Sequence, residues 1–279
     1  MNQTKTPQDK LLFGLGLGLG ILALAVVIAA AVMLINMGAA MLAPLMPTEP
    51  APTLPPLAEN SYDPEDFVMQ EGYMTLASGE YMLGIDVSEW NGDIDWQAVK
   101  EAGVEFVYIR VGGRGWGQAG VMYGDGMAQT YYEGAKEQGL LIGAYFFSQA
   151  ATPEEAREEA LYCLDATADW EMDLPIVMDW EYISDEGRTN GMTRRQRTDC
   201  VLEFCRTVAR AGKRGALYTG AEILQQWMYP HELEEIPFWL AMYTTNMDYP
   251  YRFAAWQYTG SGRVPGISTD VDMNIMPIK

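Results

Sequence analysis

The chain has 279 residues and a formal net charge of −20 at pH 7, from 38 acidic and 18 basic side chains. So acidic a chain argues against nucleic acid or an anionic lipid surface as a partner held by long-range attraction, and it is otherwise typical of a well-solvated exterior. With three cysteines and one histidine, the chain lacks the residues for a disulfide framework or a histidine-rich zinc site.

The first feature along the chain is an uncharged apolar segment, residues 11–37. It exceeds the roughly 20 residues that a helix needs to cross a bilayer, which predicts a transmembrane signal anchor. The small residues at 38–40 leave cleavage as a signal peptide open. Lys5 and Lys10 precede the segment, so the positive-inside rule places residues 1–10 in the cytoplasm and the rest of the chain outside.

Residues 38–80 are expected to form a linker and a lead-in to the folded domain. Prolines stand at positions 44, 47, 50, 52, 55 and 56. Such a segment cannot form a helix or an interior strand and is typical of a semi-rigid extended spacer. Residues 61–80 carry no clear periodicity, and we expect a short lead-in packed on the domain.

From residue 81 to the C-terminus, 81–279, strand and helix signals alternate. Apolar and aromatic runs predict strands at 81–87, 104–111, 140–148, 174–181, 214–219, 238–243, 253–258 and 271–275. Capping residues and terminal glycines predict helices at 95–102, 127–138, 152–168 and 193–212. This alternation predicts the α/β class and an irregular (β/α) TIM-like barrel, because helices are short or absent after the fifth strand.

The glycine-rich segment 111–117 follows the second predicted strand. It lacks Gly-Lys-Ser/Thr, and no long helix begins directly after it, so a nucleotide-binding loop is disfavoured. We expect residues 112–126 to form a flexible loop at the rim of the barrel.

Two carboxylates, Asp179 and Glu181, end the apolar run 174–181. On a strand they point to the same face, with Cα atoms about 7 Å apart. Two carboxyl groups in a partly dry pocket do not both ionise easily, and a protonated one beside an ionised one is what cleavage of a glycosidic bond requires. Acidic triplets recur elsewhere in the chain, but this one lies at the C-terminal end of a predicted buried strand, where α/β barrels carry their chemistry.

The cysteines and the histidine do not form a recognisable nucleophilic apparatus. Cys200 and Cys205 lie five residues apart in one predicted helix and would distort it if bridged. We expect buried free thiols, while a bridge from Cys163 to either of them stays open. His231 lies in a predicted loop, and no nucleophile-elbow sequence accompanies it.

Three acidic motifs resemble glycoside hydrolase family 25, the lysozymes (N-acetylmuramidases) of bacteria, fungi and phages. They are Gly84-Ile-Asp-Val-Ser88, Asp179-Trp-Glu181 and Val271-Asp-Met-Asn274. Supporting segments lie at 143–148, 217–219, 239–241 and 256–258, so the resemblance covers about residues 81–278. It implies an irregular barrel that cuts the β-1,4 bond between N-acetylmuramic acid and N-acetylglucosamine in peptidoglycan, without a metal or organic cofactor.

The resemblance also implies roles for the acidic residues. Glu181 corresponds to the general acid that protonates the leaving oxygen. Asp179 and Asp86 resemble the other central carboxylates, which would orient the acetamido group or stabilise positive charge on the sugar. Asp272 matches the final aspartate, a structural or electrostatic partner at the floor. Direct attack by a carboxylate and participation of the acetamido group both stay open.

Aromatic side chains at predicted strand ends are candidates for stacking on sugar rings, although each of them would serve equally well as core. They are Tyr145, Trp180, Tyr218, Trp239 and Trp256. Arg110 ends the second predicted strand and is expected to pair with a central carboxylate. Phe146 stands where the family pattern often has a histidine, which removes one polar contact.

Together these features predict a single-pass, outward-facing muramidase of a bacterial cell, of the Gram-positive type. Its partners would be peptidoglycan glycan strands and, through the N-terminal helix, the membrane. Two alternatives stay open: a non-catalytic glycan-binding module on the same fold, and a tethered member of a cell-wall assembly or secretion complex.

Overall fold

A computed structural model describes residues 57–278 of the chain. The predicted cytoplasmic N-terminus, the transmembrane anchor at 11–37 and most of the proline-rich linker lie outside this range. Within it, no helix is both long enough and apolar enough to cross a membrane.

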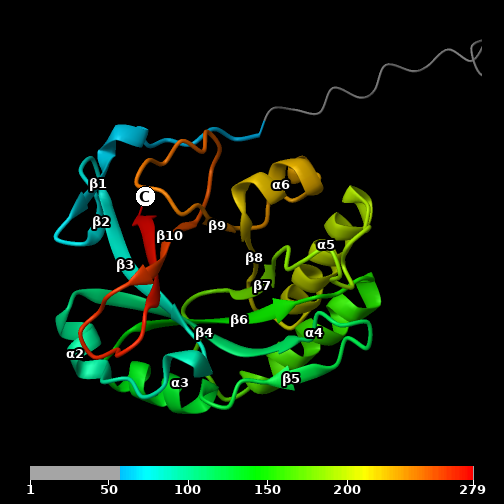
Figure 1. The fold of residues 1–279 in the computed structure, drawn as a ribbon, viewed down its shortest axis with the longest axis horizontal. Coiled ribbons are helices and arrows are strands. Elements are labelled where there is room, and N and C mark those ends of the chain that lie inside the picture. The colour runs from blue at the N-terminus through cyan, green and yellow to red at the C-terminus, as the bar shows by residue number, and fades with distance from the viewer. Residues whose placement is uncertain (1–56, 279) are drawn as a thin grey trace, which may run out of the picture. The chain divides into compact units, whose positions relative to one another are not determined.

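Eight strands close into a barrel, which confirms the predicted irregular α/β barrel (Figure 1). In chain order they are β3 (Glu80–Val87), β4 (Val104–Arg114), β6 (Leu141–Ser148), β7 (Ile176–Trp180), β8 (Gly215–Gly220), β9 (Phe238–Ala241), β10 (Ala255–Gly262) and β11 (Val271–Ile278). The chain order is also the order around the barrel, and β11 closes it by pairing with β3. Strands β3 to β10 run parallel, whereas β11 is antiparallel to both of its neighbours.

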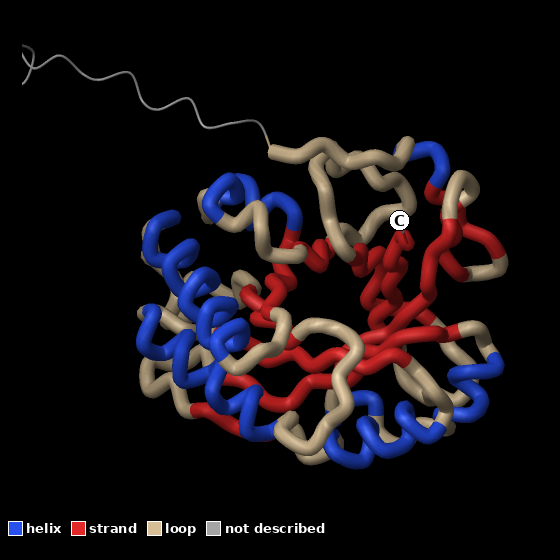
Figure 2. The backbone as a smooth tube through the Cα atoms, turned by 180° about the vertical axis from the view of Figure 1, so that it is seen from behind, coloured by secondary structure: helices blue, strands red, loops and turns tan. Residues whose placement is uncertain are grey.

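Helices pack against one part of the barrel's outer surface (Figure 2). They are α2 (Trp96–Glu101), α3 (Ala128–Glu137), α4 (Pro153–Ala166), α5 (Arg194–Arg210) and α6 (Ala221–Trp227). Their starts follow the predicted caps: Asp95 and Thr152 each accept a backbone N–H, and Thr193 forms a reciprocal capping box with Gln196. In the described part of the chain no α-helix separates β9, β10 and β11, as predicted.

A β-hairpin precedes the barrel and covers its helix-free flank. After a 3-10 turn, η2 (Pro64–Asp66), strands β1 (Phe67–Gln70) and β2 (Tyr73–Leu76) pair antiparallel. Glu71 and Gly72 form the two-residue turn, both with positive φ (51° and 91°), the backbone of a type I′ turn. Phe67 is buried, and its ring meets that of Trp256 edge-on at 5.5 Å.

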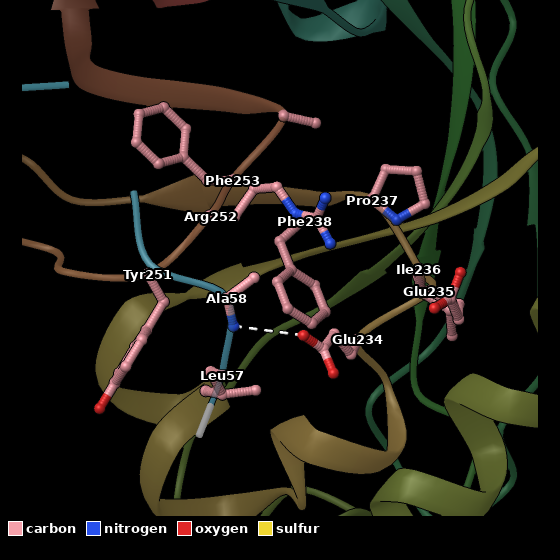
Figure 3. Close-up of a pocket in the computed structure, with 11 residues that line it drawn as sticks. Leu57, Ala58, Glu234, Glu235, Ile236, Pro237, Phe238, Tyr251, Arg252 and Phe253 are labelled. Atoms are coloured by element: carbon pink, nitrogen blue, oxygen red, sulfur yellow. Dashed lines mark hydrogen bonds between the residues drawn. The ribbon is translucent and has the colours of Figure 1, made fainter. Parts of the chain in front are cut away.

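The end of the linker is held at the N-terminal ends of the barrel strands (Figure 3). Asn60 N–H donates to the Pro250 carbonyl at 2.8 Å, and Arg252 N–H donates to the Ala58 carbonyl at 2.9 Å. Ala58 N–H donates to Glu234 Oε1 at 3.2 Å. A pocket of about 300 Å³ lies beside this segment, near Phe238 at the start of β9. The described chain therefore begins at the end of the barrel opposite to the C-terminal ends of the parallel strands.

Strand β4 runs to Arg114 and so extends into the segment predicted as a loop. Its last residues pair with β5 (Met122–Gly124). Gly112 and Gly113 permit this pairing, because a Cβ on Gly112 would lie 2.4 Å from the Tyr123 carbonyl oxygen. The prediction of a loop over 112–126 is therefore wrong for its first residues, where missing side chains allow close strand pairing rather than flexibility.

The barrel interior is filled by inward-facing side chains of alternate strand residues. The buried members of this cluster are Phe106, Tyr108, Tyr145, Val177, Ala216, Tyr218, Trp239 and Ala255. Gly84 gives space to this layer, since a Cβ there would lie 2.3 Å from the Phe106 ring. Gly143 does the same for the Tyr108 ring, at 2.2 Å.

All three cysteines are buried and free, which confirms the prediction. Cys200 and Cys205 lie in α5, and Cys163 lies in α4. Burial raises the pKa of each thiol, so none is poised as a nucleophile.

Candidate active site

Four carboxyl groups meet in one pocket at the mouth of the barrel. Asp86 lies at the end of β3, Asp179 lies in β7, and Glu181 follows β7 directly. Asp272 lies near the start of β11 and reaches the same place because that strand is antiparallel, which pairs it in register with Asp86. All four line a cavity of about 100 Å³, so the structure brings together every carboxylate that the sequence singles out.

Two amide side chains hold Asp86 in a fixed orientation. Gln257 Nε2 and Asn274 Nδ2 each donate a hydrogen bond to Asp86 Oδ2 at 2.8 Å. Trp239 Nε1 donates to Asn274 Oδ1 at 2.7 Å, and Tyr218 OH donates to Gln257 Oε1 at 2.6 Å. An indole N–H can only donate, so it sets the orientation of the Asn274 amide and makes Asp86 Oδ2 an acceptor.

Asp86 and Asp272 form the first acidic pair, and burial is the main cause of their raised pKa values. It raises the pKa of Asp86 well above its ordinary value, and the neighbouring Asp272 raises it further, while the amide hydrogen bonds lower it. Burial also raises the pKa of Asp272 to about 6, with a further contribution from Glu181. The pocket therefore gains a proton more readily than a solvent-exposed pair would.

Asp179 and Glu181 form a second pair of neighbouring carboxyl groups. Burial raises the pKa of both groups. The charge of Glu181 and the hydrogen bond between the two raise the pKa of Asp179 further, and the same hydrogen bond lowers that of Glu181. Asp179 Oδ1 has no hydrogen-bond partner among residues 57–278. Such a dyad holds one proton over a range in which isolated carboxyl groups would have lost theirs.

Three of the predicted sugar-stacking residues line the acidic pocket: Tyr145, Tyr218 and Trp239. Each is an inward-facing residue of its strand and is almost fully buried. The polar atoms of Tyr218 and Trp239 bind the amides that hold Asp86, and the Trp239 indole also stacks on the Tyr108 ring at 4.5 Å.

Trp180 and Trp256 point away from the pocket, which corrects the prediction that they contact substrate. The Arg197 guanidinium lies 5.2 Å from the Trp180 ring, on the side of the helices. Trp256 Nε1 donates to the Met242 carbonyl at 2.8 Å. Side chains alternate along a strand, so the residues next to the inward-facing Asp179 and Gln257 must face outward.

The expected pairing of Arg110 with a central carboxylate is also wrong. Arg110 Nε donates to Asp125 at 2.8 Å, and its Nη2 lies 3.3 Å from Glu89. Both partners belong to the segments around β4 rather than to the acidic pocket. Its charge nevertheless lowers the pKa of Asp179, which opposes the effect of burial.

Three residues of the site were missed from the sequence. Asn274 could have been found, because it lies two residues after Asp272 on the same face of a strand. Gln257 is an inward-facing polar residue between two aromatic neighbours, Trp256 and Tyr258, in a barrel strand. Tyr243, whose side chain is 65 % exposed, donates to Gln257 Oε1 at 2.9 Å and closes one wall of the pocket.

The arrangement by itself defines a class of protein. An acidic mouth in a β/α barrel, with two neighbouring carboxyl groups whose pKa values are raised by burial, is the arrangement of a glycoside hydrolase. Within residues 57–278 no group of three or more histidine, cysteine and carboxylate side chains could hold a metal ion.

Residues 85–267 match the glycosyl hydrolases family 25, and the chain belongs to this family. It is 31% identical over 202 residues to "Lysozyme M1" of Streptomyces globisporus. The aligned residues cover 68% of this chain and 66% of that protein. It is 30% identical over 196 residues to "Autolytic lysozyme" of Clostridium acetobutylicum, an alignment that covers 69% of this chain and 55% of that protein. The chain thus spans less than two thirds of the length of these relatives.

A solved structure shows the same fold. The bacterial lysozyme of Streptomyces coelicolor superposes with a TM-score of 0.57 and 30% sequence identity, covering 71% of this chain and 91% of that one. The hairpin β1–β2 lies before the segment that matches the family.

Proposed function

We propose that this protein is a muramidase that cleaves the β-1,4 bond between N-acetylmuramic acid and N-acetylglucosamine in peptidoglycan. The observation that carries the proposal is the buried Asp179–Glu181 dyad at the barrel mouth. Membership of glycosyl hydrolases family 25 and similarity to lysozymes support the choice of substrate.

Three of the four carboxyl groups have a defined task in this reaction. Glu181 takes the dyad proton and gives it to the leaving glycosidic oxygen, because it lines both the acidic pocket and the adjoining cavity formed with Tyr182 and Ile223. Asp179, left ionised, then stabilises positive charge on the sugar. A water molecule finally adds to the anomeric carbon and returns a proton to Glu181. Asp86, with one oxygen occupied by two amide donors, presents the other to the substrate or to the developing charge.

Digestion of purified peptidoglycan tests the proposal. The full-length protein, Glu181→Gln and the control Glu137→Gln, an exposed residue at the end of α3, are compared over about pH 4 to 8. Products are reduced with borohydride and identified by mass spectrometry. Reduced muramic acid ends from the parent and the control, absent with Glu181→Gln, are the expected result.

Other products would contradict the proposal in distinct ways. Reduced glucosamine ends would show that the protein is a glycosidase but that it cuts a different bond from the one proposed. Sedimentation onto the wall without any release would instead favour a glycan-binding module.

We further propose that the apolar segment 11–37 anchors the protein in the membrane with the barrel outside the cell. Its freedom from charge and the preceding Lys5 and Lys10 support this orientation. Removal of residues 1–43 is expected to release the protein from the membrane fraction, and protease added to intact protoplasts should digest the barrel of the parent. A shortened chain that stays in the membrane fraction would contradict the anchor.

A further inference from the structure

A second cavity adjoins the acidic pocket on the helix-free flank of the barrel. It has a volume of about 560 Å³, and we call it the hairpin groove. One wall comes from the β1–β2 hairpin, through Met69 and Tyr73, and the other from Thr244, Thr245, Thr259 and Ser261. The hairpin lies before the segment that matches the family, residues 85–267, whereas the opposite wall lies within it.

The hairpin groove lies next to the acidic pocket and shares one residue with it. Tyr243 lines both cavities, and its hydroxyl is bonded to Gln257 of the acidic site. Gly260 lies at the junction, where an added Cβ would be 3.0 Å from Asp272 Oδ1 and 3.5 Å from the Tyr243 hydroxyl. A side chain at that position would crowd both Asp272 and Tyr243, so the glycine leaves space between them.

The volumes show why a substrate would need this extension. The acidic pocket, at about 100 Å³, is well below the ~300 Å³ at which pockets enclose small ligands. A glycan strand held there by the sugars beside the cut bond must continue along the surface on both sides.

The lining of the hairpin groove has the chemistry of a sugar site. Hydroxyl groups of Thr244, Thr245, Thr259 and Ser261 line the groove. Thr244 Oγ1 accepts from Asn246 N–H, and the Thr259 and Ser261 hydroxyls are bonded to each other at 3.2 Å. A hydroxyl both donates and accepts, so each keeps a further position for the hydroxyl and acetamido groups of a sugar. The half-buried Tyr73 supplies a rigid aromatic wall for an apolar sugar face.

From this adjacency and lining we infer that the hairpin groove binds the glycan strand several sugars away from the bond that is cut. This inference rests on the proposed muramidase function, since it assigns the same polymer to both cavities. Binding in the hairpin groove makes the protein selective for long glycan strands over short fragments.

Binding measurements in an uncleaving background test the inference. In full-length Glu181→Gln, affinity is measured for long glycan strands and for a GlcNAc–MurNAc tetrasaccharide. Tyr73→Ala is expected to weaken binding of long strands by about tenfold and to leave the tetrasaccharide unchanged. Thr245→Trp, an exposed position where a bulky ring fills the groove, should give the same loss without threatening the core.

The matched control is Tyr251→Ala, another half-buried tyrosine, which lines the pocket at the opposite end of the barrel. It should bind both ligands as the parent does. Parent-like binding of long strands by both groove variants would overturn the inference, as would an equal loss for long and short ligands. If the active parent releases muramic acid ends in that case, the proposed function stands without the groove. A parent that cleaves nothing refutes the muramidase, while the long-strand affinities still decide the groove.

Discussion

Replacing Asp272 by asparagine should stabilise the protein at neutral and alkaline pH. Asp272 carries one of the four crowded carboxyl groups, and burial raises its pKa to about 6. No hydrogen bond from its side chain to another residue of the described chain would be lost. The substitution therefore removes a buried charge at nearly constant shape.

The expected gain follows from the difference between the folded and unfolded pKa values. A folded pKa of about 6 against an ordinary value of 3.8 corresponds to about 3 kcal/mol, at ~1.36 kcal/mol per pKa unit. Because the folded state binds the proton more tightly, the parent loses this free energy as the pH rises from about 4 to about 6. The variant should match the parent near pH 4 and exceed it by up to about 3 kcal/mol at pH 8.

Urea denaturation of the full-length protein at pH 4, 6 and 8 measures the effect. Asp270→Asn is the control, because Asp270 lies two residues earlier, is exposed and forms a surface ion pair with Arg263 at 2.7 Å. Its removal should change stability by less than about 1 kcal/mol at every pH. A gain for Asp272→Asn that is equal at pH 4 and pH 8, or no gain at either, would refute the titration argument.

Two further predictions concern the packing around the site. Asn274→Leu removes the donor to Asp86 and leaves the Trp239 N–H without its acceptor. The free energy of unfolding, measured by urea denaturation, should therefore fall by about 2–4 kcal/mol. Unchanged stability would show that the amide does not hold the site. Gly84→Ala places a methyl group 2.3 Å from the Phe106 ring. It should lower the free energy of unfolding by about 1–3 kcal/mol or prevent folding, seen as a lowered melting temperature or a loss of soluble protein. A parent-like melting temperature would contradict the close approach.

Local patterns in the sequence predicted most of the barrel because its strands and caps are local features. The caps at Asp95, Thr152 and Thr193 each need only a side-chain oxygen and a backbone N–H within one turn. The spacing of Asp179 and Glu181 likewise needs only the alternation of a strand. That same alternation, applied strictly, would have placed Trp180 and Trp256 outside the barrel.

Long-range partners could not be predicted in this way. Gln257 and Asn274 bind Asp86 across 171 and 188 residues of sequence. Strand alternation places Asn274 on the same face as Asp272, but it does not indicate that either amide binds Asp86. Arg110 is expected from the sequence to pair with a central carboxylate, but it pairs instead with Asp125, which lies 15 residues away in the sequence. Which polar groups meet depends on the closure of the barrel, a property of the whole chain.

The antiparallel direction of β11 connects the irregularity of the barrel to its chemistry. In a barrel of parallel strands only, the second residue of a strand would lie at the end away from the mouth. Reversal of β11 brings Asp272 beside Asp86, and an antiparallel connection needs no crossover helix. That flank is consequently free for the β1–β2 hairpin, which packs through Phe67 on Trp256 and forms one wall of the hairpin groove. One change of strand direction thus adds a carboxylate to the acidic pocket and leaves the adjoining flank open to the hairpin.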